Sequence, residues 1–234
     1  MPFYPVNLRI TDRLCVVVGG GDVALRKTRG LLEADARIRL ISPTVLPELR
    51  MLAEEGQISW VERGYVEGDL KGAFLVFAAT NDRIVQTRIK IEAEKTGVIL
   101  NSADDPKGSD FHIPAHFRRG KMLIAISTGG GSPALAKKIR QKLEEEIGPE
   151  YEAAVDLLFL LRERLLEGRA FSADHSELFH RLLHLGILDL LRKEEWFELQ
   201  MLLLRELPEN IDAIALVRQF LEKHDGKRRP SVSR

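Results

Sequence analysis

A glycine turn at residues 19–21 carries the clearest chemical signal in the sequence. It follows a short apolar run, residues 14–18, and leads directly into a helix-forming segment that includes Ala24. A strand, a glycine turn and a helix in the form G-x-G-x-x-A are typical of a dinucleotide site, because the pyrophosphate needs a backbone without side chains and faces the helix N-terminus. The residues that we expect to bind the cofactor here are Gly19, Gly20, Gly21, Asp22 and Val23.

The end of the second predicted strand bears on the choice between NAD and NADP. A dinucleotide site usually has an acid here, which binds the ribose 2′-hydroxyl, or an arginine that accommodates a 2′-phosphate. This chain has Ser42, Pro43 and Thr44 instead. We expect these residues to contact the ribose more weakly, and the position alone does not decide between the two cofactors.

The apolar run at residues 74–79 ends in Thr80, Asn81 and Asp82. Small residues at this point would allow a cofactor to lie over the carboxyl edge of a parallel sheet, where open α/β folds bind ligands. Asp82 is also a good cap for the next helix, and the two interpretations are compatible. We expect Thr80 and Asn81 to contact the cofactor.

A carboxylate, Asp104, follows the last predicted strand of this part of the chain. At the carboxyl edge of the sheet such a group is well placed for proton transfer beside a nicotinamide. An aspartate that precedes Asp-Pro is also typical of a turn. The position by itself leaves both roles open.

A second glycine-rich turn, residues 127–132, leads into another predicted helix with Ser132 as its cap and Pro133 as its first residue. Such a turn predicts a second anion site. The basic residues near it in the sequence are Arg118, Arg119, Lys121, Lys137, Lys138 and Arg140. They favour a polyanionic ligand, although a solvated charged helix face gives the same pattern. The residues that we expect to bind this ligand are His112, Arg118, Ser127, Thr128, Gly129, Ser132 and Lys137.

The histidines predict no metal centre. His180 and His184 are four residues apart and would share one helix face, a spacing that metal sites use. A third ligand at a recognisable spacing is missing, so a packing or surface position is favoured. His112 and His116 flank Pro114 in a connecting segment, where they could face a cleft.

Alternating strands and helices must position these groups. Strands are predicted at residues 14–18, 37–42, 58–62, 74–79 and 98–101, with helices at 23–33, 46–55 and 83–95. Strands separated by helices predict an α/β fold of the Rossmann type, a doubly wound parallel sheet covered on both faces. A strand at 121–126 and a helix at 134–147 follow. Beyond them the pattern is helical at residues 151–167, 175–193, 195–207 and 211–223, with breaks at Gly186 and Pro208.

The composition is that of an ordinary globular protein. Of its 234 residues 44% are hydrophobic, and 35 Lys and Arg balance 35 Asp and Glu, which gives no electrostatic argument for nucleic-acid binding. The single Cys15 fits a reducing compartment. Without a long apolar run or a signal-peptide pattern, we expect a cytoplasmic protein that does not enter a membrane.

The motifs, taken in order, resemble the precorrin-2 dehydrogenase family, which includes the N-terminal half of siroheme synthase and its stand-alone relatives. The resemblance covers the chain up to about residue 150, at residues 18–27, 78–82, 101–106, 111–115 and 126–136. Two positions depart from the family pattern. Gln86 stands where the family commonly has asparagine, and Ser102 and Ala103 stand where it commonly has valines.

The resemblance implies NAD-dependent oxidation of precorrin-2 to sirohydrochlorin, with Asp104 as the group that accepts or relays a proton. It implies a tetrapyrrole substrate, whose carboxylates would account for the basic residues around the second glycine turn. It also implies a homodimer joined by the segment at residues 113–148. Some members of the family insert ferrous iron into sirohydrochlorin, so iron is a further candidate co-substrate.

The predicted organisation has four parts. They are a Rossmann NAD-binding domain (residues 1–112), a small α+β dimerisation segment (113–148), an all-helical domain (149–224) and a disordered basic tail (225–234), for which a solvated terminus is favoured over a nucleic-acid contact. The alternative function is a regulatory or binding protein that senses NAD without catalysis. That alternative would leave Asp104 and the second glycine turn without a role.

Overall fold

The computed structural model describes residues 3–105, 107–166 and 173–228 of the chain. These residues form two compact units that divide between Ile113 and Pro114. The first unit corresponds to the predicted Rossmann domain. The second unit unites the predicted dimerisation segment with the helices that follow it.

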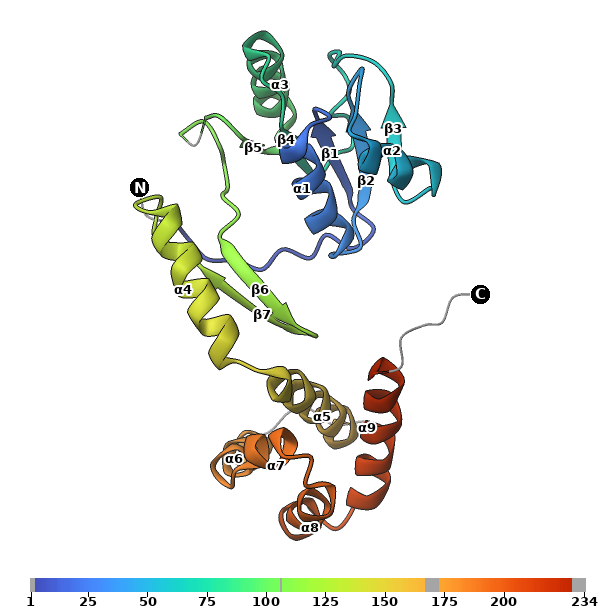
Figure 1. Cartoon of the computed structure of the whole chain (residues 1–234), viewed down its shortest axis with the longest axis vertical. Coiled ribbons are helices and arrows are strands. Elements are labelled where there is room, and N and C mark those ends of the chain that lie inside the picture. The colour runs from blue at the N-terminus through green and yellow to red at the C-terminus, as the bar shows by residue number, and fades with distance from the viewer. Residues whose placement is uncertain (1–2, 106, 167–172, 229–234) are drawn as a thin grey trace. The chain divides into compact units, whose positions relative to one another are not determined.

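The first unit contains a parallel sheet with the strand order β3-β2-β1-β4-β5 (Figure 1). Its strands are β1 (Leu14–Val18), β2 (Arg37–Ile41), β3 (Ser59–Val61), β4 (Leu75–Ala78) and β5 (Ile99–Ser102). The chain proceeds outward from β1 through β2 and β3, then returns to the other side of β1 for β4 and β5. This reversal between β1 and β4 is the point at which open α/β sheets bind ligands.

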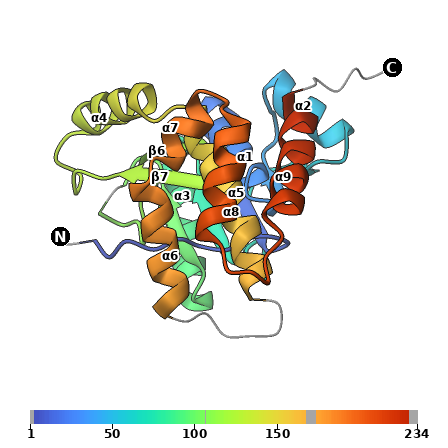
Figure 2. The ribbon, with the colours of Figure 1, turned by 90° about the horizontal axis from the view of Figure 1, so that it is seen from below.

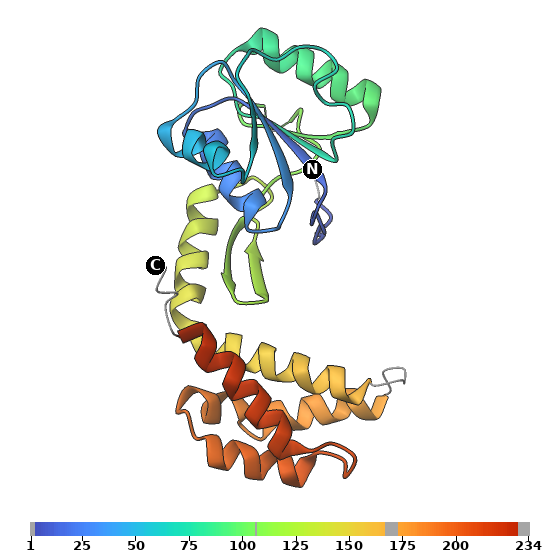
Figure 3. The ribbon, with the colours of Figure 1, turned by 90° about the vertical axis from the view of Figure 1, so that its right-hand side faces the viewer.

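Helices cover both faces of this sheet, and they are α1 (Asp22–Leu32), α2 (Pro47–Glu54) and α3 (Arg83–Thr96). Figure 3 shows α3 on the opposite face from α1 and α2. Cys15 and Val17 belong to the apolar layer beneath α1, whereas Val16 and Val18 belong to the layer beneath α3. Because both faces are buried, β1 is a continuous apolar run. Burial also raises the pKa of the Cys15 thiol to about 11, so this thiol stays protonated.

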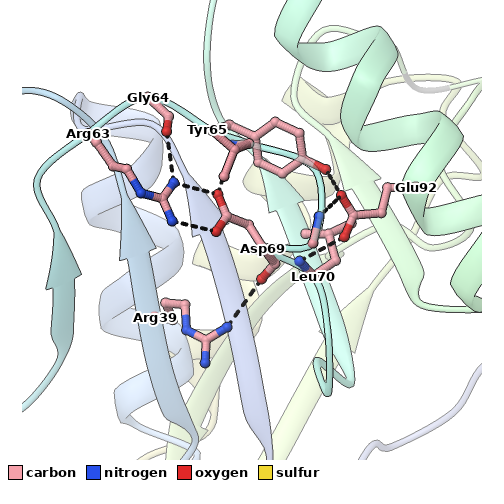
Figure 4. Close-up of polar contacts among 9 residues, drawn as sticks. Arg39, Arg63, Gly64, Tyr65, Asp69, Leu70 and Glu92 are labelled. Atoms are coloured by element: carbon pink, nitrogen blue, oxygen red, sulfur yellow. Dashed lines mark hydrogen bonds and ion pairs between the residues drawn. The ribbon is translucent and has the colours of Figure 1, made fainter.

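The long connection between β3 and β4 is held to α3 by the carboxylate of Glu92 (Figure 4). Its oxygens accept hydrogen bonds from the Tyr65 hydroxyl and, at 3.0 Å each, from the backbone N–H groups of Gly68 and Leu70. Burial and the bond to Glu92 raise the pKa of Tyr65, so its phenol remains a donor. A carboxylate that is only 5% exposed is tolerated here because these three donors satisfy it.

Asp69 orders the same connection. Arg63 donates two hydrogen bonds of 2.8 Å to its two carboxylate oxygens, and the Val66 N–H adds a third of 2.9 Å. The Arg39 side chain reaches the Asp69 carbonyl at 3.2 Å. The Arg63 guanidinium holds the pKa of Asp69 below its usual range. The crossing from β3 to β4 is thus fixed on the side of α3.

The second unit begins with an antiparallel hairpin, β6 (Ala115–Arg119) and β7 (Met122–Ile126), with α4 (Pro133–Glu146) packed against it (Figure 2). The sequence predicts β7 but not β6. Phe117 is the one buried residue of β6, so this strand lacks the apolar run that marks the others. Its pairing with β7 is set by packing against α4 and not by a local pattern.

Further helices follow, and they are α5 (Pro149–Leu165), α6 (Ala173–His184), α7 (Ile187–Arg192), α8 (Trp196–Glu206) and α9 (Ala213–Arg228). They share an apolar core that includes Leu157, Leu182, Leu199 and Phe220. Gly186 has a φ of 84° and separates α6 from α7, as the predicted break requires. Among the described residues, no helix combines the length and the apolarity needed to cross a membrane.

Helix α9 runs to Arg228, so the predicted disordered tail at residues 225–234 begins too early. Lysine and arginine are good helix formers, and extending an existing helix costs far less than starting one. The remainder of the predicted tail, residues 229–234, lies outside the described residues.

Replacing Glu92 by glutamine is expected to destabilise the first unit by about 1–3 kcal/mol, because the amide group leaves one backbone donor unsatisfied. Urea unfolding followed by Trp60 fluorescence, in a Trp196→Phe background, measures this unit. The exposed Glu94 on the same helix supplies the control, and Glu94→Gln should change the stability by less than about 0.5 kcal/mol. An unchanged midpoint for Glu92→Gln would contradict the role of Glu92.

Candidate active site

The glycine turn between β1 and α1 is pressed against the ends of two neighbouring strands. Gly19 has a φ of 128°, and a Cβ atom there would lie 2.1 Å from the carbonyl oxygen of Ala79, just beyond β4. A Cβ atom at Gly20 would lie 2.0 Å from the carbonyl oxygen of Thr44, beyond β2. Both positions therefore require glycine, and the turn closes β1 tightly against its neighbours.

Gly21 differs from these two glycines because a Cβ atom there would meet nothing within 4 Å. It is the N-cap residue of α1 and offers no side chain to the first N–H groups of the helix. Those N–H groups and the positive end of the helix dipole are the partners that a pyrophosphate requires. The open side of Gly21 and the free helix end fit a dinucleotide. Asp22 and Val23 would serve it through their backbone N–H groups.

The segment after β2 offers few free groups. Ser42 is buried, and its hydroxyl donates a hydrogen bond of 2.6 Å to the carbonyl of Thr44. Its own carbonyl accepts a bond of 3.0 Å from the indole N–H of Trp60. The Ser42 donor is thus engaged within the turn, whereas Pro43 and Thr44 are exposed. Contact of these residues with a ribose stays a prediction.

The end of β4 continues into the cap of α3. Asp82 caps this helix, since its Oδ1 accepts from the N–H groups of Ile84 and Val85 at 2.8 and 3.2 Å. The Thr80 hydroxyl accepts from the Asp82 N–H at 3.2 Å, and Asn81 is exposed. Thr80 and Asn81 follow directly on Ala79, whose carbonyl touches the glycine turn.

Asp104 lies at the end of the neighbouring strand. The N–H of Ala103 donates to the carbonyl of Ala78 at 3.0 Å, so the pairing with β4 continues to Ala103, the residue before Asp104. The Gln86 side-chain amide donates to Asp104 Oδ2 at 3.0 Å and to the Thr80 carbonyl at 2.6 Å. The sequence marks Gln86 only as a departure from the family pattern. Its contact with Asp104 depends on the pairing of β5 with β4, which no local pattern shows.

The chain after Asp104 turns back along β5. The Leu100 N–H donates to the carboxylate of Asp110, and the Asn101 side chain donates to the carbonyl of Phe111, each at 2.8 Å. The backbone of Asp104 is therefore anchored by strand pairing before it and by this return segment after it. His112 follows, and its ring packs on Phe3 with the centroids 4.7 Å apart.

Lys27 in α1 lies near the carboxyl end of β4, with its Nζ 5.0 Å from the centre of the Phe77 ring. Burial, and then the charge of Arg26, lower the pKa of Lys27 to about 8. Within the described part of the chain, no carboxylate forms an ion pair with it. The ring face of Phe77 compensates a part of the desolvation of this charge.

The second glycine-rich turn is ordered by its own hydroxyl groups. Thr128 Oγ1 donates to the Ser132 carbonyl at 3.1 Å and accepts from its N–H at 3.0 Å. Ser127 Oγ accepts from the N–H of Gly129 at 3.2 Å. Ser132 caps α4 through the Leu135 N–H at 3.2 Å, as the sequence predicts. These hydroxyl groups form hydrogen bonds within the turn and at the start of α4. That they also bind a ligand stays a prediction.

The basic residues around this turn fall into two groups. Three pair with acidic side chains, and these are Arg119, Lys121 and Arg140. Three are exposed and form no ion pair within the described residues, and these are Arg118, Lys137 and Lys138. Of the six basic residues that the sequence places near this turn, three are therefore available to an anionic ligand in the described structure. Among the described residues, no group of three or more His, Cys, Asp or Glu side chains could hold a metal ion.

The first unit brings together the glycine turn, the end of β4 and Asp104. His112 belongs to the same unit. The other residues expected to bind substrate belong to the second unit, and these are Arg118, Ser127, Thr128, Gly129, Ser132 and Lys137. The parallel sheet and the glycine turn at its switch point define a dinucleotide-binding protein of the Rossmann class.

Comparison with known proteins agrees with this class. Residues 6–115 match the family model described as putative NAD(P)-binding, and residues 119–146 match the model described as sirohaem biosynthesis protein, central. Siroheme synthase 1 of Aeromonas salmonicida is 37% identical over 183 residues, which are 78% of this chain and 39% of that protein. Siroheme synthase of Pseudomonas paraeruginosa is 39% identical over 167 residues, 71% of this chain and 36% of that protein.

A solved structure covers nearly the whole chain. SirC, a precorrin-2 dehydrogenase, superposes with a TM-score of 0.67 at 26% identity, covering 96% of this chain and 100% of that one. The chain spans about two fifths of the length of the curated relatives named above. The resemblance expected from the motifs is confirmed, since the chain is similar to siroheme synthases over more than two thirds of its own length and to SirC over nearly all of it.

Alanine at Gly20 is expected to destabilise the first unit by about 1–3 kcal/mol, since the new Cβ overlaps the Thr44 carbonyl. Gly21→Ala should keep the wild-type melting temperature and still lose NAD binding, because its Cβ enters the space beside the α1 N-terminus. Calorimetric titration with NAD and thermal melting measure the two effects. The control is Gly30→Ala in the interior of α1, which should gain about 0.5–1 kcal/mol and bind NAD normally. Normal NAD affinity in Gly21→Ala would refute the assignment of the turn.

Lys27→Met is expected to raise the melting temperature, and more so at pH 7 than at pH 10. The pKa of Lys27 in the folded chain, about 8, lies below the ordinary value of 10.5. Between pH 8 and pH 10.5 the unfolded chain therefore binds more protons at this lysine than the folded chain does. The free energy of unfolding therefore rises with pH through this window in the wild type, and Met removes that rise. Lys71→Met, at an exposed lysine, is the matched control. An equal effect of Lys27→Met at both pH values would exclude this explanation.

Proposed function

We propose that the chain oxidises precorrin-2 to sirohydrochlorin with NAD. The observation that carries the proposal is the position of Asp104, which follows the strand next to β4 while the glycine turn touches the end of β4. A dinucleotide site and a carboxylate are therefore held at the same edge of one sheet. The similarity to SirC and to siroheme synthases supports the identity of the substrate.

Each group in the first unit has a part in this reaction. The glycine turn and the first N–H groups of α1 hold the pyrophosphate, with Thr80 and Asn81 beside it. When bound, NAD supplies a nicotinamide ring that accepts a hydride. Asp104 takes the proton that the macrocycle loses with that hydride, and passes it to water. The balance is one hydride to the cofactor and one proton to solvent.

The substrate is a polycarboxylate, and the groups proposed to bind it are cationic or donate hydrogen bonds. Arg118 and Lys137 are exposed and free of acidic partners in the described structure, so their charges are available to carboxylates. His112 and the turn at residues 127–132 complete the proposed set. We further propose that residues 113–148 join two copies of the chain and that the protein works in the cytoplasm.

Assays with sirohydrochlorin, ferrous iron and NAD distinguish two other functions from this one. Iron insertion would convert sirohydrochlorin on addition of ferrous iron in the absence of NAD. An NAD sensor without catalysis would bind NAD with normal affinity and show no affinity for sirohydrochlorin.

Asp104→Asn is expected to lower the rate of precorrin-2 oxidation by about a hundredfold or more, because the amide cannot accept the proton. Absorbance at the bands of sirohydrochlorin follows the conversion, and calorimetry checks that NAD affinity is unchanged. The neighbouring Asp105→Asn is the control, since asparagine can still accept the bond that Asp105 receives from the Gly108 N–H. Wild-type turnover by Asp104→Asn would remove Asp104 from the mechanism.

A further inference from the structure

We propose that Gln86 is the positioning residue that holds Asp104 in its working orientation. The inference rests on the proposed function, because Asp104 must be the proton acceptor for its orientation to affect the rate. Gln86 itself contacts neither reacting atoms nor, in our proposal, the cofactor.

The Gln86 amide connects the ends of two strands. Its Nε2 donates to the carbonyl of Thr80, beyond β4, at 2.6 Å and to Asp104 Oδ2, beyond β5, at 3.0 Å. Both partners can act only as acceptors, so the NH2 group and not the amide oxygen must face them. The orientation of the Gln86 amide is therefore fixed by its partners.

Gln86 is held in place from its own side as well. Asp82 caps α3, and the Gln86 N–H donates to the Asp82 carbonyl at 2.9 Å in the first turn of the helix. The Thr80 hydroxyl is bonded to the Asp82 N–H at 3.2 Å. The segment from Thr80 to Gln86 is thus a closed turn, and the amide extends from it toward β5. Gln86 is partly buried, whereas Asp104 is exposed.

Without this amide, Asp104 would be an exposed side chain that rotates freely. The bond from Gln86 is the one hydrogen bond to the Asp104 carboxylate that the described residues make. A donor on an ionised carboxylate forms a charge-assisted bond, which is stronger than one between neutral groups. It engages Oδ2 and leaves Oδ1 for the proton, so one oxygen fixes the group while the other reacts.

The length of the side chain matters for this arrangement. An asparagine at this position would be one methylene shorter. The glutamine of this chain reaches both the Thr80 carbonyl and the Asp104 carboxylate from α3. The longer amide is what allows one residue to bridge both strand ends.

A merely structural role would also place an amide here, since it closes the gap between the ends of β4 and β5. The two roles differ in whether the effect of losing the Gln86 contact depends on the carboxylate of Asp104. A structural contact affects stability and binding whether or not residue 104 is a carboxylate. A positioning contact affects the turnover number only when Asp104 is present to be positioned.

The experiment is a double-mutant cycle of Gln86→Met and Asp104→Asn in the full chain. Methionine keeps the length of the side chain and removes the donor. We expect Gln86→Met to lower kcat on the order of tenfold, with KM for precorrin-2 and the affinity for NAD within about twofold. In the Asp104→Asn background the same change should have no further effect on kcat. Gln141→Met, at an exposed glutamine of α4, is the matched control and should behave as wild type.

Three outcomes would overturn the inference. They are an unchanged kcat in Gln86→Met, an equal loss in both backgrounds, and a loss that appears in KM or in NAD affinity alone. If the wild type itself fails to oxidise precorrin-2, the proposed function fails instead. The contact is then read from the Gln86 side-chain N–H resonances in NMR, which are assigned by their loss in Gln86→Met. They should shift in Asp104→Asn, and unshifted resonances would refute the contact itself.

Discussion

The close approach of the glycine turn to its neighbouring strands is the constraint on which the site depends. The carbonyl oxygens of Ala79 and Thr44 occupy the space that side chains at Gly19 and Gly20 would need. The register ends β1, β2 and β4 at the same level, with Val18 opposite Ile41 and Ala78, and the two glycines allow the turn to pass against both neighbours. β5 pairs with β4 one residue further, to Ala103. The phosphate-binding turn and the carboxylate are thus placed by backbone packing before any ligand is present.

Local patterns predicted most of the first unit. The apolar run at residues 14–18 marked a strand buried on both faces, and residues 19–21 marked the turn. Asp82 and Ser132 were predicted as helix caps from their residue types alone, and both accept hydrogen bonds from the first turn of their helices. Features that depend on a short stretch of backbone can be read in this way, because the stretch itself contains the cause.

The features that were missed depend on partners distant in the sequence. Strand β6 has a single buried residue and exists because it pairs with β7 and packs on α4. Glu92 looks like an ordinary helix-surface acid until the β3–β4 connection supplies its three donors. The contact of Gln86 with Asp104 spans 18 positions and requires the register of β5 against β4. Side-chain identity suggested none of these partners.

The two glycine-rich turns differ in how their helices begin. At α1 the N-cap is Gly21 and makes no side-chain bond, whereas at α4 the Ser132 hydroxyl already occupies the N–H of Leu135. At α1 no described side chain uses the first N–H groups, although the acidic Asp22 stands in the same turn, whereas at α4 one N–H is used by the cap and no acidic residue stands in the first turn. The two helix ends therefore differ in the backbone donors that they leave for an anion. α1 keeps all of its first N–H groups, and α4 has already committed one of them to its own cap.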